Sequence, residues 1–285
     1  MTSAPHLQIV RAMTTPERKA IVERFRARNA GEAWIFNEDA LEESAVVIDP
    51  FRGFLRRGRS AHKPVATRAA MPDDAAKAAR AFVERNADLL GLPTAVVHGL
   101  AEERSAAGGH WSIRFDATYP TKGYETLREL DNQVDLDVVV ADDGAVTAFQ
   151  NRSRIHPLLH IPLRPRLAPD DATLVREVVG RQVFAMVGAP GQEDPRALPR
   201  IALGAIRLED VQHVELTVWS SPGPAQAYVS YRLAYTVDVT RGVRSGFMDP
   251  FFKPVGYTFR YIVDADTGQV IEDARPPVTA LVEEP

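Results

Sequence analysis

The segment Val138-Val139-Val140-Ala141-Asp142-Asp143-Gly144-Ala145-Val146 decides the fold, because two apolar runs flank an acidic turn that closes on glycine. Glycine readily adopts the positive φ of a tight reversal, and β-branched residues favour a half-buried strand. The segment therefore predicts an antiparallel β-hairpin.

The same pattern occurs twice more, at residues 46–55 and 261–271. In these two copies the aspartate and the glycine of the turn are four positions apart, whereas the copy at 138–146 is shorter. The structural turn residues that we expect are Asp49, Gly53, Asp142, Gly144, Asp264 and Gly268. The repetition suggests duplicated α+β units, and such units often bind other polypeptides.

Three segments carry helical patterns. Residues 16–30 predict a short amphipathic helix that ends at Gly31. Residues 72–90 begin with acids that complement the helix dipole and are followed by Gly91, which predicts the clearest helix of the chain. We expect a further acid-capped helix over residues 170–187, from its apolar spacing.

The remaining apolar segments alternate with polar residues and predict strands. These strands are expected at residues 33–36, 44–48, 111–119, 134–140, 212–219, 227–239 and 257–264. Hairpins rather than crossover helices connect them, which indicates antiparallel sheets. The predicted fold class is α+β, with two modules that each pack a helix on one face of an antiparallel meander.

The expected domain organisation has four parts. Residues 1–32 form an N-terminal arm with a short helix, and 33–155 form the first α+β module. The proline-rich segment 156–169 links it to the second module, 170–285, because repeated proline excludes a helix interior or a central strand.

Composition limits the partners. The 285-residue chain has a net charge of −4 and a pI near 6.0, so we expect neither nucleic acid nor an anionic membrane as a partner. No run approaches the ~20 apolar residues of a membrane span. Cysteine is absent, which excludes disulfides and thiolate chemistry. A basic cluster is interpreted as a solvated strand edge, with anion binding as the alternative; it comprises Arg52, Arg56, Arg57 and Arg59.

The chain resembles the propeptide region of thermolysin-type and fungalysin-type metallopeptidases, in which a fungalysin/thermolysin propeptide unit precedes a PepSY unit. Residues 78–92 are similar to the family's helix with its leucine-glycine-leucine end. Residues 111–119 and 138–146 are similar to its first long strand and the following hairpin. Residues 231–239 with 261–270 are similar to the closing PepSY hairpin.

This resemblance, over residues 33–273, implies an inhibitor and folding chaperone of a peptidase. None of the seven histidines is followed by glutamate, so the zinc-binding His-Glu-x-x-His motif is absent and we expect no enzymatic activity. The protein would then act in trans on a separate partner. No signal peptide is visible, which suggests a cytoplasmic protein as written, although the resembled family is usually exported.

Local motifs give no catalytic residue, cofactor or metal site. His156 and His160 have the spacing of helical metal ligands, but the intervening Pro157 favours linker histidines. A set of acids could hold calcium, although solvated strand residues explain it equally well; it comprises Asp131, Asp135, Asp137, Asp142 and Asp143.

Aromatic residues are the best candidates for contact with a partner. The apolar loop 246–254 would supply protein-binding anchors if exposed, with packing onto the core as the alternative. The candidate binding residues are Phe247, Met248, Phe251, Phe252 and Trp219. The leading hypothesis is a non-enzymatic protein-binding module that binds its partner through a sheet face or the loop 247–252. The alternatives are an assembly subunit that uses exposed strand edges and a hydrolase. The sequence does not predict an oligomeric state.

Overall fold

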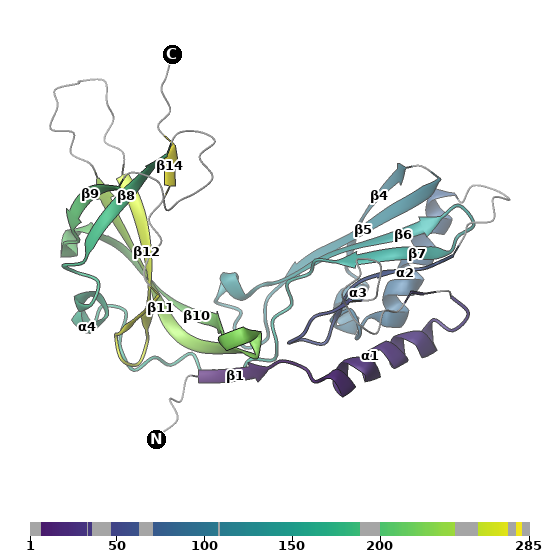
Figure 1. Cartoon of the computed structure of the whole chain (residues 1–285), viewed down its shortest axis with the longest axis horizontal. Helices are drawn as coiled ribbons and strands as arrows, with labels where there is room; N and C mark the ends of the chain where they lie inside the picture. The colour runs from purple at the N-terminus through teal and green to yellow at the C-terminus, as the bar shows by residue number, and fades with distance from the viewer. Residues whose placement is uncertain are drawn as a thin grey trace, which may run out of the picture. The chain divides into compact units, whose positions relative to one another are not determined.

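A computed structural model describes residues 7–32, 34–35, 47–62, 71–107, 109–188, 200–242, 256–272 and 278–280. The chain divides into two compact units. One comprises residues 9–159 and 222–229, and the other comprises residues 1–8, 160–221 and 230–285. Helices combine with largely antiparallel sheets, so the α+β class is confirmed (Figure 1). The PepSY-like arrangement of two equivalent modules stays a prediction.

The unit around residues 9–159 is built on a six-stranded antiparallel sheet with the order β2-β3-β7-β6-β5-β4. Its strands are β2 (Val47–Ile48), β3 (Leu55–Arg59), β4 (Ala101–Ala107), β5 (His110–Tyr119), β6 (Asn132–Ala141) and β7 (Val146–Asn151). The hairpin predicted at 138–146 therefore lies in the middle of this sheet. Ile113 opposite Val138 and Phe115 opposite Leu136 bury the apolar face that the alternation predicts.

Helices cover that apolar face. They are α1 (Thr15–Arg28), α2 (Pro72–Asn86) and the short α3 (Thr94–Val97). Figure 1 shows α1 and α2 on the same side of the sheet. Phe82 and Val83 of α2 and Ile21 and Phe25 of α1 are all buried in one core with the sheet residues. Helix and sheet thus close the core because each presents one apolar side.

The remaining strands form two smaller sheets, most of whose residues belong to the second unit. One has the order β1-β11-β12-β13, and β10 also pairs with β11; the other has the order β14-β8-β9. The strands are β1 (Leu7–Arg11), β8 (Gln182–Gly188), β9 (Arg200–Ala205), β10 (Val211–Pro222), β11 (Tyr228–Gly242), β12 (Gly256–Asp264), β13 (Val270–Glu272) and β14 (Val278–Ala280). The pairing of β14 with β8 is parallel, whereas β8–β9, β11–β12 and β12–β13 are antiparallel.

The helix predicted over residues 170–187 is wrong for most of its length. Helix α4 spans only Ala172–Arg176, and Gln182–Gly188 forms strand β8. Gly180 separates them with a φ of +89°, and its N–H donates to the Ile206 carbonyl. Leu174 and Val178 are buried as expected. The later apolar residues belong to a strand that pairs with β9, so spacing alone misassigned them.

The N-terminal helix belongs to the first unit's core and does not form a separate arm. Ile21 and Phe25 are buried there, and the unit extends from Ile9 to Leu159. The proline-rich segment 156–169 contains neither helix nor strand, and the boundary between the units falls within it, after Leu159.

Candidate binding surfaces

The first and third predicted turns share one hydrogen-bond pattern. The Asp49 carbonyl accepts from the Gly53 N–H, and the Asp264 carbonyl accepts from the Gly268 N–H. Each aspartate Oδ1 also accepts from the backbone N–H groups two and three positions later, at 2.8–3.0 Å. The φ angles of +69° at Gly53 and +72° at Gly268 explain why glycine closes both turns.

An arginine from a neighbouring segment holds the other carboxylate oxygen in both turns. Arg56 Nη2 lies 2.7 Å from Asp49 Oδ2, and Arg232 Nη1 lies 3.5 Å from Asp264 Oδ2. Burial opposes ionisation of Asp49, but the hydrogen bonds from Arg56 and from the turn backbone outweigh it and lower its pKa. These aspartates therefore bind their own turns. Of the basic cluster, Arg56 is committed to this structural role.

The middle turn is shorter and differs. The Gly144 N–H donates to the Ala141 carbonyl, and the Ala145 N–H donates to Asp143 Oδ1. Asp143 Oδ2 lies 2.7 Å from Nε2 of His62, whereas Asp142 is half-buried. Asp143 therefore stabilises the hairpin turn and contacts His62 of a neighbouring segment.

The face of the six-stranded sheet that does not carry α2 is polar, and we call it the polar face. The strand registers place five residues in one row across it: Glu103, Arg114, Asp137, Gln150 and Arg57. All are exposed except Asp137, which is half-buried. Opposite charges alternate along the first three positions, and the row ends in an exposed arginine. The polar face therefore carries a defined charge pattern across five strands.

Ion pairs fix side chains on the polar face. Arg152 contacts both Asp135, at 3.0 Å, and Asp137, and Arg114 lies 3.3 Å from Asp135. The hydrogen bond from Arg152 is the main reason that the pKa of Asp135 is lowered. The acids considered for calcium at these two positions thus have guanidinium partners. Among the described residues, no group of three or more histidines or acids has the arrangement of a metal site.

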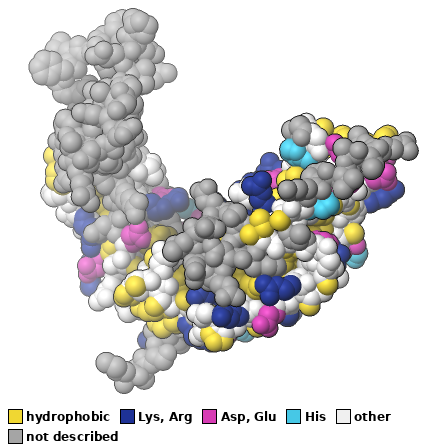
Figure 2. All heavy atoms as spheres, turned by 45° about the vertical axis from the view of Figure 1, so that its right-hand side comes forward, with side chains coloured by type: hydrophobic (Ala, Val, Ile, Leu, Met, Phe, Trp, Pro, Cys, Tyr) yellow, Lys and Arg dark blue, Asp and Glu magenta, His cyan; other side chains and the backbone are white. Residues whose placement is uncertain are grey.

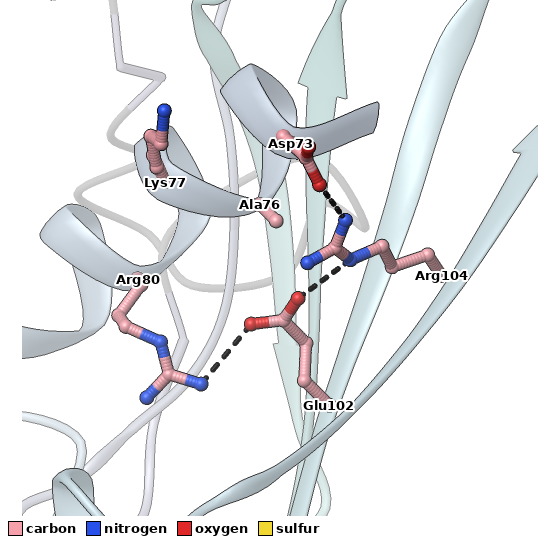
Figure 3. A pocket seen from close by; sticks show the side chains of 6 residues that line it. All are labelled: Asp73, Ala76, Lys77, Arg80, Glu102 and Arg104. Atoms are coloured by element: carbon pink, nitrogen blue, oxygen red, sulfur yellow. Dashed lines mark hydrogen bonds and ion pairs between the residues drawn. The ribbon is translucent and has the colours of Figure 1, made fainter. Parts of the chain in front are cut away.

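A second surface is a groove between α2 and the edge strand β4, which we call the α2–β4 groove (Figure 3). It is a hollow of about 220 Å³ lined by Asp73, Ala76, Lys77, Arg80, Glu102 and Arg104. Glu102 lies at its centre, 3.0 Å from Arg80 Nη2 and 2.7 Å from Arg104 Nε. Arg104 also contacts Asp73 at the start of α2. A ladder of charges therefore joins the helix to the strand.

The charges of the α2–β4 groove are mutually satisfied. Burial raises the pKa of Glu102, but its hydrogen bonds to Arg104 and Arg80 outweigh this effect, so its pKa is lowered. Arg80 also lies over the Phe115 ring, 5.3 Å from its centre. A hollow of this size is smaller than the roughly 300–1,000 Å³ of pockets that bury small ligands. The groove suits a structural ion-pair network or a single side chain of a partner.

The predicted binding residues are only partly placed. Trp219 lies on β10 and is half-buried. Phe247, Met248, Phe251 and Phe252 lie outside the residues that the structure describes. The sequence predicted a sheet face as a possible binding surface without assigning its residues, and it did not predict the groove. Strand alternation pointed to a polar face, but the partners across it depend on strand registers that the sequence does not reveal.

His156 is a half-buried histidine rather than half of a metal pair. Residues 156–160 are not helical, so the ligand geometry considered for His156 and His160 is not formed, and His160 is exposed. The His156 backbone N–H donates to Asn132 Oδ1 at 2.7 Å, whereas its buried Nδ1 has no hydrogen-bond partner within the described chain. Burial is the main cause that lowers its pKa; the Arg52 charge adds to this, and Asp131 opposes it.

The lowered pKa of His156 predicts a loss of stability in mild acid. The unfolded histidine takes up a proton near pH 6.5, whereas the folded one resists protonation. Stability from this group is therefore complete above about pH 6.5 and falls as the pH decreases below it. We expect His156→Gln to flatten the pH dependence of the urea midpoint between pH 7.5 and 5, while the exposed-site variant His98→Gln keeps it. Equal slopes in both variants would contradict this role.

No family model matches the chain, and no curated protein matches it. A solved structure with distant similarity is that of an uncharacterized protein from Eubacterium rectale ATCC 33656. It shares 9% identity over 94% of this chain and 86% of that chain, with a TM-score of 0.27. At this level the similarity supports no argument about fold or function.

On the face that Figure 2 shows, basic and acidic side chains of the described residues are interspersed. No helix in the described part of the chain is long and apolar enough to cross a membrane.

Proposed function

We propose that this chain is a non-enzymatic protein-binding module that inhibits or chaperones a partner protein, such as a metallopeptidase, in the manner of a propeptide. The observation that carries this proposal is the polar face of the six-stranded sheet. Its cross-strand row from Glu103 to Arg57 displays charged side chains at fixed spacing on a rigid support. Such a charge pattern gives a partner orientation and specificity more than raw affinity.

The proposal predicts inhibition and assisted folding of a thermolysin-like peptidase by the purified full chain. Both activity and refolding yield of the peptidase would be measured with the chain at micromolar concentration. Binding through the polar face predicts that Arg57→Glu, at the end of the row, weakens inhibition roughly tenfold, because one reversed charge adjacent to a partner costs about 1.4 kcal/mol.

The control is Lys19→Glu, an equal charge reversal at an exposed position of α1. It should leave inhibition unchanged. Equal loss in both variants would indicate a general charge effect, and no effect of the unmodified chain on either activity or refolding would argue against a peptidase partner.

A further inference from the structure

Strand β10 is a long sheet edge. It has 12 residues, and within the described chain it pairs with β11 alone. An edge strand presents alternate backbone N–H and C=O groups without a strand partner, which makes it a template for another strand. The edge therefore either carries protection against pairing or serves as a pairing site.

The two sheet edges β4 and β10 differ in protection. Strand β4 has 7 residues, and Glu102, Glu103 and Arg104 place charges at its centre. Such charges block edge-to-edge association. In β10, Glu215 is the sole residue among Asp, Glu, Lys and Arg, and its proline, Pro222, comes at the last position. Strand β10 thus has the length and composition of a pairing edge.

The sequence of β10 is compatible with itself. When two identical antiparallel strands pair about a two-fold axis, one residue lies opposite its own copy, and residues equally distant from it oppose each other. With Leu216 on the axis, Val214 faces Val218 and Glu215 faces Thr217 of the second strand. In the same register His213 faces Trp219, and Val211–Ser221 pairs throughout.

This register opposes no like charges and continues one apolar stripe across both strands. Val214, Leu216 and Val218 share one side of β10 and are half-buried or buried already. Cross-strand pairs of aromatic and β-branched residues stabilise such a junction. A direct opposition of acids arises only when Glu215 itself lies on the axis.

We propose that a second copy of this chain docks on β10, so that two β10 strands pair antiparallel about Leu216 and form an isologous dimer. This interaction is separate from binding of a partner on the polar face, because it uses another sheet. It gives Trp219 a role as an interface residue that covers His213 of the second copy.

The test measures mass in solution for the full chain. Sedimentation equilibrium should give twice the 31.4 kDa chain mass at a concentration of about 100 μM. Gln212 and Ser220 oppose each other in the proposed register. Both side chains are exposed, so we expect the fold to tolerate their substitution. The double variant Gln212→Lys/Ser220→Lys places lysine opposite lysine twice. We expect the dissociation constant of the dimer to increase roughly tenfold or more.

Two further variants make the test specific. Gln212→Lys/Ser220→Glu places opposite charges in the same two pairs and should restore the dimer. Ser105→Lys adds one charge to the exposed edge of β4 and should leave the mass unchanged. The proposal is overturned if the unmodified chain is monomeric at about 100 μM, if the lysine double variant remains as dimeric as the unmodified chain, or if the lysine–glutamate variant fails to recover.

Discussion

Replacing Phe82 by alanine should lower the free energy of unfolding of the six-stranded unit by about 3–5 kcal/mol. Phe82 on α2 is fully buried, and its ring centre lies 5.6 Å from that of Trp34 and 5.5 Å from that of Phe149. Phe25 of α1 joins the same cluster at 6.2 Å. Removing the ring therefore leaves a cavity at the point where both helices meet the sheet, and aromatic contacts are lost as well.

The measurement is urea unfolding, with hydrogen exchange of the α2 amides to assign the loss to this unit. Phe82→Leu is the matched control, because it keeps an apolar side chain of similar volume and should lose less than about 1.5 kcal/mol. A midpoint for Phe82→Ala that equals that of the leucine variant would mean that the aromatic cluster contributes little.

Local patterns predicted the first unit well, since its elements carry their own signals. Acids begin α2 as predicted, although the helix ends at Asn86, four residues before the predicted end at residue 90. Strand β5 covers His110–Tyr119, where strict alternation marks its two faces. The backbone of the aspartate-to-glycine turns at Asp49 and Asp264 is fixed by hydrogen bonds within each turn, although Arg56 and Arg232 bind the second carboxylate oxygen from outside it.

The remaining features depend on contacts between distant segments. Residues 182–188 have apolar residues that fit a helix period, but pairing with β9 makes them a strand. The row on the polar face joins Glu103 to Arg57 through four strand registers, and a shift by one residue would reverse its faces. Neither the registers nor the Glu102 ladder to α2 has a local sequence signal.

A buried pair of asparagines joins α1 to α2. Asn29, the residue that caps the end of α1, is 3% exposed, and Asn86, the last residue of α2, is 0% exposed. Asn29 Nδ2 donates to Asn86 Oδ1 at 3.1 Å, and Asn86 Nδ2 donates to Asn29 Oδ1 at 3.3 Å. Each Nδ2 also donates to the carbonyl four residues earlier in its own segment, at Phe25 and Phe82. The two amides thus satisfy each other inside an apolar core.

Removing one asparagine should therefore cost more than removing both. In Asn86→Leu, Asn29 keeps its bond to Phe25 but loses both bonds across the pair, and each buried polar group left unpaired costs about 1–3 kcal/mol. We expect a total loss of the order of 2–4 kcal/mol, measured by urea unfolding. Replacing both residues by leucine removes the unpaired amide, so Asn29→Leu/Asn86→Leu should recover most of the loss. If the two single losses simply add in the double variant, the amides act independently, and the pair does not hold α1 against α2.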